Sequence, residues 1–214
     1  YGEKTKEFLD KYVVLLGKAE TDEDKHNISL DWSKDHELLI LGTKITPDNF
    51  RTAINKSNAQ LRDGCVNFIN NLKLHNIPFT IVSSGIGDII ELFLHKEGVS
   101  YYNIVTNFID FENDTVRGFK KPFVSTYNKD QIVLPVKNKP NIILIGDAIE
   151  DSKMSDSIEN KEIVLKIGFC SKTIKVEKYK QYYDIVLVDD QTMDVVQEIV
   201  SPLLFNKSKK EGNL

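Results

Sequence analysis

From Leu61 onward, short apolar runs alternate with amphipathic stretches, and this alternation constrains the fold more than any other feature of the sequence. Short apolar runs bounded by turn residues predict buried strands, and apolar residues at helical spacing predict helices. The predicted strands are 78–83, 104–107, 142–146, 163–168 and 184–189, and the predicted helices are 61–74, 87–97, 150–157 and 191–204. Such alternation is typical of an α/β fold, in which helices cover a parallel sheet.

Two segments depart from this rhythm. Up to about Asn58 the apolar residues recur at helical spacing, as Phe8, Leu9, Tyr12 and Val13 do, which predicts an all-helical part. Within 106–126 the polar letters "ENDT" separate two arms of alternating apolar residues, which predicts a β-hairpin. We therefore expect a small helical domain over residues 1–60 and an α/β core over residues 61–214.

Net charge, hydropathy and cysteine content indicate the partners and the compartment to expect. The 214 residues carry 28 basic and 32 acidic side chains, for a net charge of −4 and a pI of about 5.6, so we expect no binding to nucleic acid or to an anionic membrane. No apolar run approaches the roughly 18 residues of a membrane span. Cys65 and Cys170 lie in apolar contexts, which is typical of reduced thiols in a reducing compartment. We expect a cytoplasmic protein and, as the default, a monomer.

The stretch "IVSSGIGDIIE" places two serines and two glycines between a predicted strand and a predicted helix. Ligands of open parallel sheets bind beyond the carboxyl ends of the strands, and the N–H groups at a helix start are suited to phosphate. Ser83, Ser84 and Gly85 are therefore candidate phosphate ligands. A serine cap beside a glycine turn is the alternative, and it is favoured for this stretch taken alone.

Two later positions add charged groups. In "NIILIGDAIEDSKMSD" an apolar run delivers Asp147 to a strand end, and Asp151 follows four residues later. Carboxylate oxygens are ligands that Mg²⁺ prefers, although an aspartate after a strand is often a helix cap. Lys120 in "RGFKKPF" could neutralise a phosphate, although an isolated surface lysine usually has no specific role.

A hydroxyl, a lysine and an Asp-x-x-x-Asp in this order resemble the back half of the site in haloacid-dehalogenase-type phosphohydrolases. Over nearly its whole length the chain resembles the cytosolic 5′-nucleotidase III family, also called the pyrimidine 5′-nucleotidase family. The segments that carry the resemblance are "SSGIGDIIE", "NFIDFENDTVRGFK", "NIILIGDAIEDSKMSD", "VLKIGF" and "YYDIVLVDDQTMDVV".

The resemblance implies a haloacid-dehalogenase-like three-layer core with a parallel sheet, a helical cap and a β-hairpin. It also implies Mg²⁺-dependent hydrolysis of nucleoside 5′-monophosphates, with pyrimidines preferred, through an aspartyl-phosphate. Its site residues map onto this sequence as follows: Ser83 bonds the phosphoryl group with help from Ser84 and Gly85, Lys120 balances charge, Asp147 ligates Mg²⁺, and Asp151 supports that metal shell.

The cap segment "SLDWSKDHELLI" resembles the segment that faces the nucleobase in this family. Asp31 stands where the family carries a glutamate, and Trp32 and His36 are further candidates for base contact. The alternative is that Trp32 and Leu38 only hold the core of the cap, with His36 exposed. Whether the base is cytosine, uracil or a methylated purine stays open.

The family's attacking aspartate lies in an Asp-x-Asp motif that closes a strand upstream of the cap, and no such motif follows an apolar strand before Ser83. Asp22 and Asp24 have the spacing but sit in a polar loop. Ala148 and Glu150 replace a serine and a glycine of the family. We expect an upstream segment that carries the motif on a strand between those ending at Ser83 and Gly146. A catalytically inactive nucleotide- or phosphate-binding module is the alternative.

Overall fold

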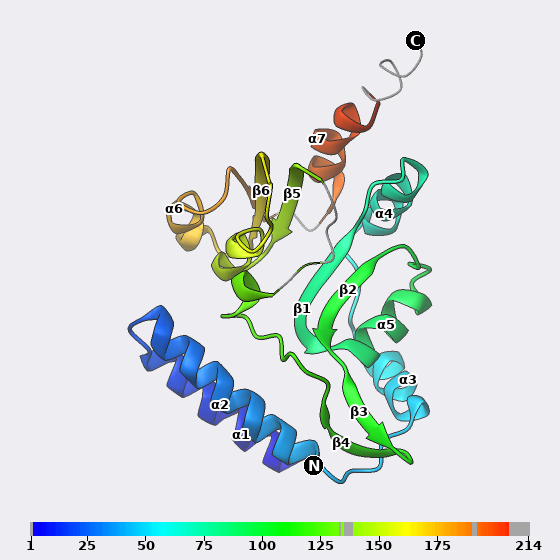
Figure 1. Cartoon of the computed structure of the whole chain (residues 1–214), viewed down its shortest axis with the longest axis vertical. Helices are drawn as coiled ribbons and strands as arrows, with labels where there is room; N and C mark the ends of the chain where they lie inside the picture. Colours follow the sequence, from blue (N-terminus) through cyan, green and yellow to red (C-terminus); the bar gives the residue numbers. More distant parts are fainter. Residues whose placement is uncertain (1, 133, 135–138, 190–191, 206–214) are drawn as a thin grey trace.

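The computed structural model describes residues 2–132, 134, 139–189 and 192–205 (Figure 1). Its helices are α1 (Gly2–Lys18), α2 (Asp22–Ile40), α3 (Pro47–Lys56), α4 (Cys65–Leu74), α5 (Gly87–Lys96), α6 (Val176–Tyr179) and α7 (Asp194–Phe205), with 3-10 helices η1 (Lys129–Gln131), η2 (Ile149–Lys153) and η3 (Thr173–Lys175). Its strands are β1 (Thr80–Ile86), β2 (Asn103–Asn107), β3 (Ile109–Glu112), β4 (Thr115–Phe119), β5 (Asn141–Gly146), β6 (Ile163–Cys170) and β7 (Ile185–Val188). Among the described residues, no helix has the length and apolar character needed to cross a membrane.

The predicted parallel sheet is confirmed. β1 pairs with β2, and β5, β6 and β7 pair in that order, all in parallel. Because successive strand residues point to opposite faces, Ile145 packs in the cluster built by α4 and α7, whereas Leu144 packs with Tyr179 and Tyr183 on the other face. The core therefore has the three layers of an α/β fold, with the strands in the middle.

The sheet is interrupted between β1 and β5. These strands belong to separate sheets, and the described residues contain no backbone pairing between them. Ile81 of β1 and Ile145 of β5 nevertheless pack against the same apolar cluster. One hydrophobic core thus supports two parallel ladders that no strand pairing joins within the described residues.

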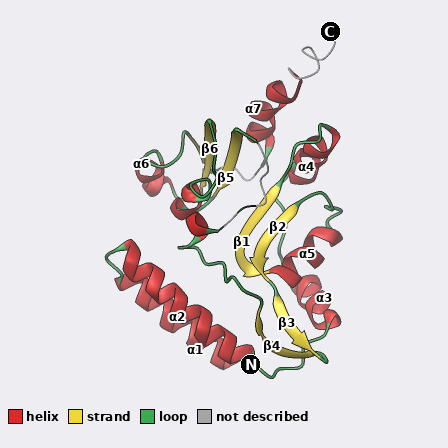
Figure 2. Cartoon of the chain, viewed as in Figure 1, coloured by secondary structure: helices red, strands yellow, loops and turns green. Residues whose placement is uncertain are grey.

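The first sixty residues are helical, as predicted, and they pack with the hairpin β3–β4 (Figure 2). The hairpin turns at Asn113 and Asp114, both with positive φ, which is the backbone of a tight two-residue turn. Phe50 of α3 and Val116 of β4 lie in one buried cluster. The hairpin therefore packs against the N-terminal helices, and the same cluster also contacts Ile89 and Leu92 of α5. The domain boundary at residue 60 stays a prediction.

Residues 150–157 do not form the predicted helix. The structure has the short 3-10 helix η2 instead, because the Asp151 carboxylate folds back onto the N–H groups of Asp147 and Ala148. Ser152 Oγ likewise donates to the carbonyl of Ile149. Such local side-chain bonds to the backbone compete with a continuing α-helix.

Asp24, which sequence reasoning left unassigned, has a structural role. Its carboxylate accepts hydrogen bonds from the backbone N–H and the hydroxyl of Thr21, and Thr21 Oγ1 accepts from the Asp24 N–H. This reciprocal arrangement is a capping box at the start of α2. The Asp-x-Asp spacing at 22–24 thus lies at a helix start and does not close a strand.

Candidate functional site

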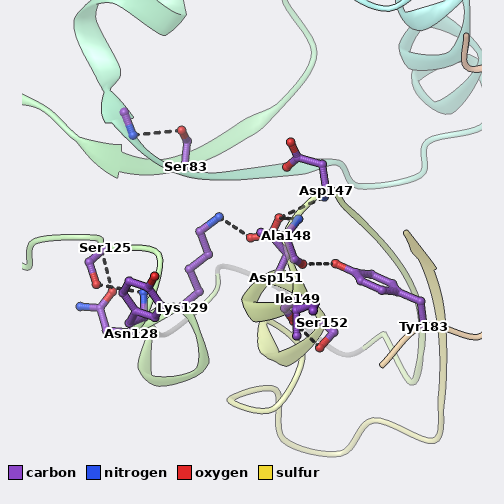
Figure 3. A network of polar contacts seen from close by, with 12 residues as sticks. Ser83, Ser125, Asn128, Lys129, Asp147, Ala148, Ile149, Asp151, Ser152 and Tyr183 are labelled. Carbon is purple, nitrogen blue, oxygen red and sulfur yellow. Dashed lines mark hydrogen bonds and ion pairs between the residues drawn. The ribbon is translucent and has the colours of Figure 1, made fainter. Parts of the chain in front are cut away.

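The predicted site residues at the two strand ends come from separate sheets, and Figure 3 draws Ser83 of β1 in one view with Asp147 and Asp151, which follow β5. Lys129 joins this group from η1, with its side chain reaching toward Asp151. The site is therefore built from three chain segments.

Asp151 is the most constrained carboxylate of the site. It is 4% exposed, and its Oδ1 accepts a hydrogen bond from Lys129 Nζ at 2.6 Å. Its Oδ2 accepts from the backbone N–H groups of Asp147 at 3.2 Å and Ala148 at 3.1 Å. Charge-assisted bonds of this kind are among the stronger hydrogen bonds in proteins. Asp151 therefore fixes both the ammonium group and the turn after β5.

Asp147 has a fixed backbone and a free side chain. Its carbonyl accepts from Tyr179 Oη at 2.7 Å, and the next carbonyl, of Ala148, accepts from Tyr183 Oη. Burial is the main cause that raises the pKa of both tyrosines, so both phenols stay protonated donors at neutral pH. The Asp147 side chain is exposed, and within the described part of the chain its carboxylate has no hydrogen-bond or ion-pair partner. It is thus available to a ligand.

Two glycines permit this arrangement. A Cβ on Gly168 would lie 2.6 Å from the ring of Tyr183, and one on Gly146 would lie 2.5 Å from Cβ of Asp151. Real Cβ atoms do not approach other atoms so closely. The glycines of "LIG" and "KIG" therefore let the tyrosine and the aspartate pack directly against the strand ends.

Residues 83–85, the serine turn, lie near the end of β1, where the register with β2 shifts. Side chains of β2 hold its carbonyl groups. The carbonyl of Gly85 accepts from Thr106 Oγ1 at 2.9 Å, and the carbonyl of Ser84 accepts from Asn107 Nδ2 at 3.0 Å. Ser83 Oγ accepts from the Gly85 N–H at 3.1 Å, so this N–H, a candidate phosphate donor, has a partner within the turn. Ser84 is exposed. The turn is anchored through its carbonyls, and the Ser84 hydroxyl remains accessible.

The two lysines differ sharply. Lys120, the lysine singled out from the sequence, is exposed at the end of β4, and its backbone N–H donates to the carbonyl of Phe108. Lys129 is 8% exposed and pairs with Asp151. Sequence reasoning missed Lys129 because the pair joins residues 22 positions apart and no local motif marks it.

The cap candidates lie among aromatic rings. Trp32 stacks on Tyr12 with centroids 5.5 Å apart, and His36 lies between Phe8 and Phe119 at 5.6 and 5.4 Å. Burial lowers the pKa of His36, which keeps the imidazole neutral at neutral pH.

Asp31 is exposed and forms a 3.4 Å ion pair with Lys34 on the same helix. No described hydrogen bond or ion pair joins Asp31, Trp32 or His36 to the residues at the strand ends.

The parallel α/β core matches the fold of haloacid-dehalogenase-type phosphohydrolases. A substrate-bound phosphoserine phosphatase matches 92% of the chain with a TM-score of 0.54 at 16% identity, which shows the fold alone. Cytosolic 5′-nucleotidase IIIB bound to cytidine matches more closely, with a TM-score of 0.85 at 27% identity, over 97% of this chain and 73% of that chain.

The chain belongs to the pyrimidine 5′-nucleotidase (UMPH-1) family, whose model matches residues 1–204. It is 36% identical over 211 residues to the 7-methylguanosine phosphate-specific 5′-nucleotidase B of Xenopus laevis, over 92% of this chain and 72% of the relative. The corresponding human protein is 38% identical over 185 residues, 81% of this chain and 61% of the relative. The family resemblance inferred from the sequence is confirmed, and the chain is a member of a hydrolase family.

Proposed function

We propose that this protein is a cytoplasmic 5′-nucleotidase that hydrolyses nucleoside 5′-monophosphates and prefers pyrimidine nucleotides. The observation that carries this proposal is the buried Lys129–Asp151 pair beside the turn that presents the free Asp147 carboxylate. Burial of an ammonium group costs desolvation free energy unless an opposite charge or a bound anion compensates it. The family model and the cytidine complex of the related structure support the pyrimidine preference.

In this proposal the serine turn and Lys129 bind the phosphoryl group together. The Ser83 and Ser84 hydroxyls donate to phosphoryl oxygens. Lys129, in place of Lys120, balances their charge, because an ammonium has three N–H donors and the pair with Asp151 uses one of them. Asp151 holds the ammonium in place. Charge that develops on the phosphoryl oxygens then meets donors that are already oriented.

Asp147 fits a magnesium ligand. Its carboxylate is exposed and lacks a described partner, while hydrogen bonds from Tyr179 and to Asp151 fix its backbone. The described residues contain no group of three side chains suited to a metal, so Asp147 would be one ligand among others that come from outside them. Bound Mg²⁺ would supply positive charge to the phosphate oxygens.

The interruption between β1 and β5 suggests where the attacking group lies. Edges of two parallel strands inside one core carry backbone groups that a further strand would satisfy. We propose that an extended segment outside residues 1–214 pairs with both edges and brings an Asp-x-Asp motif to the site. An aspartate there would attack phosphorus, and water would then hydrolyse the aspartyl-phosphate.

The test is phosphate release from CMP, UMP and 7-methylguanosine monophosphate with Mg²⁺. It compares residues 1–214 with a longer form that includes the first Asp-x-Asp encoded upstream. We expect release only by the longer form, and faster release from CMP and UMP. The names of the Xenopus and human relatives make 7-methylguanosine monophosphate the competing substrate. Faster release from this nucleotide would contradict the pyrimidine preference but not the proposed nucleotidase activity.

The same experiment separates two further outcomes. Phosphate binding without hydrolysis by either form would support the inactive binding module. Hydrolysis by residues 1–214 alone would place the attacking group within this sequence and contradict the proposed strand.

A further inference from the structure

Asn107 is a buried side chain near the site whose amide group is fully hydrogen-bonded. It ends β2 and is 1% exposed. Its Nδ2 donates to the carbonyls of Ser84 at 3.0 Å and Val124 at 2.8 Å, and its Oδ1 accepts from the N–H of Val124 at 2.7 Å. The amide therefore uses both of its N–H donors and its oxygen.

These bonds join two segments that are remote in sequence. Ser84 belongs to the serine turn, and Val124 opens the segment that leads to Lys129. Asn128 stiffens that segment, since its Oδ1 accepts from the Ser125 N–H at 2.7 Å and its Nδ2 donates to the Phe123 carbonyl at 2.9 Å. Asn107 thus links the serine turn directly to the start of the segment that carries Lys129.

We propose that Asn107 is a positioning residue for phosphoryl transfer: it fixes the serine turn and the Lys129 segment relative to each other so that both face one phosphoryl group. This inference rests on the proposed function. A carboxylate at this place would lack the two donors, and a leucine of similar size would lack all three bonds. The competing explanation is that Asn107 only satisfies buried backbone groups and stabilises the fold.

The chain offers two matched comparisons. Thr106, the preceding residue, bonds the Gly85 carbonyl at 2.9 Å, so Thr106→Val releases one bond to the serine turn and none to the lysine segment. Asn128→Ser loosens the lysine segment and leaves the serine turn untouched. Asn107→Leu removes the connection between the two, and Asn107→Ser does so with a smaller side chain should the leucine variant not fold.

The experiment uses the full-length protein and measures three quantities for each variant: kcat and KM for CMP, affinity for inorganic phosphate, and midpoint of thermal unfolding. Because misplacing reacting groups by about 1 Å can cost about 100-fold in rate, we expect kcat to fall by about 100-fold in the Asn107 variants. We expect this loss to exceed the product of the losses in Thr106→Val and Asn128→Ser, with phosphate affinity reduced as well.

A loss of kcat in the Asn107 variants no larger than in Thr106→Val, at a similar or greater loss of thermal stability, would overturn the inference in favour of a purely structural role. If the wild-type protein hydrolyses no nucleotide, the proposed function fails, and the phosphate affinities alone then decide on Asn107. Unchanged phosphate affinity in folded Asn107 variants would in that case overturn the inference too.

Discussion

Two clusters of side chains, one at the strand ends and one among the N-terminal helices and the hairpin, are held together by different forces. The strand-end network is a set of directional polar bonds, formed by Lys129, Asp147, Ala148, Asp151, Tyr179 and Tyr183. The cap ring cluster is a set of aromatic contacts between helices and hairpin, formed by Phe8, Tyr12, Trp32, His36, Phe119 and Phe123.

The difference teaches where this protein is precise and where it can adapt. In the strand-end network each buried polar atom has a named partner, and losing one leaves another unpaired at a high cost. In the cap ring cluster a lost ring removes one contact among several, each worth about 1 kcal/mol. We infer that the strand-end network holds the proposed catalytic groups in fixed positions. The cap ring cluster, by contrast, tolerates the loss of single contacts.

The largest effect is expected for Lys129→Met, which breaks the buried pair. The two side chains are 10% and 6% exposed, so Asp151 would be left as an uncompensated buried charge. Loss of one partner of such a pair costs about 3–5 kcal/mol. We expect a fall of that order in the free energy of unfolding, measured by urea denaturation at pH 7.

Lys120→Met is the matched control. Lys120 is exposed, and such surface substitutions usually stay within about 0.5 kcal/mol. Phosphate release from CMP by the full-length protein should be lost in Lys129→Met and kept in Lys120→Met. The reverse pattern of activity would return the charge-balancing role to Lys120.

This pair of lysines also shows how far the sequence predicts the site. The strands that end near Ser83 and Asp147 follow from apolar runs, because burial requires such runs and parallel strands align their ends. The Lys129–Asp151 contact depends on the path of the loop from Phe119 to Lys129. That path is set by tertiary bonds such as those of Asn107, which no local pattern encodes. The 3-10 helix η2 escaped prediction for a different reason, because local bonds of the Asp151 and Ser152 side chains to nearby backbone groups replace the predicted α-helix.

A smaller effect within the network is expected for Tyr183→Phe. The ring that packs on Gly168 stays, but the Ala148 carbonyl loses its donor. An unsatisfied buried group costs about 1–3 kcal/mol, so we expect thermal denaturation to show a destabilisation in this range. Tyr182→Phe, at an exposed neighbouring tyrosine, should change stability by less than about 0.5 kcal/mol. Equal effects in the two variants would show that the hydroxyl of Tyr183 does not hold the turn.

For the cap ring cluster, the test is whether Trp32 contacts the nucleobase or only its neighbours. Loss of a stacked ring is worth about 1 kcal/mol, so Trp32→Leu should raise KM for CMP by about fivefold and leave kcat within about twofold. Phe8→Leu is the control, because Phe8 contacts Trp32 and lies outside the segment that resembles the base-facing one. If both variants lose stability and neither changes KM, Trp32 only holds the core of the cap.

The smallest effect is expected from protonation of His36. Burial lowers the pKa of His36 in the folded protein, whereas in the unfolded chain it is about 6.5. As pH falls through that value the unfolded state binds the proton first, so stability is lost on acidification and none of this loss is present above about pH 7.5. We expect wild type to lose up to about 1 kcal/mol more than His36→Phe between pH 7.5 and 5.5.

His36→Phe suits this measurement because it keeps a ring between Phe8 and Phe119 while removing the titrating group. His95→Gln, at an exposed position on α5, should leave the wild-type loss in place. A loss of the same size in His36→Phe as in wild type would mean that His36 is accessible to protons in the folded cap. The ring cluster would then have to open readily, and the contrast with the strand-end network would be one of mobility as well as of bonding.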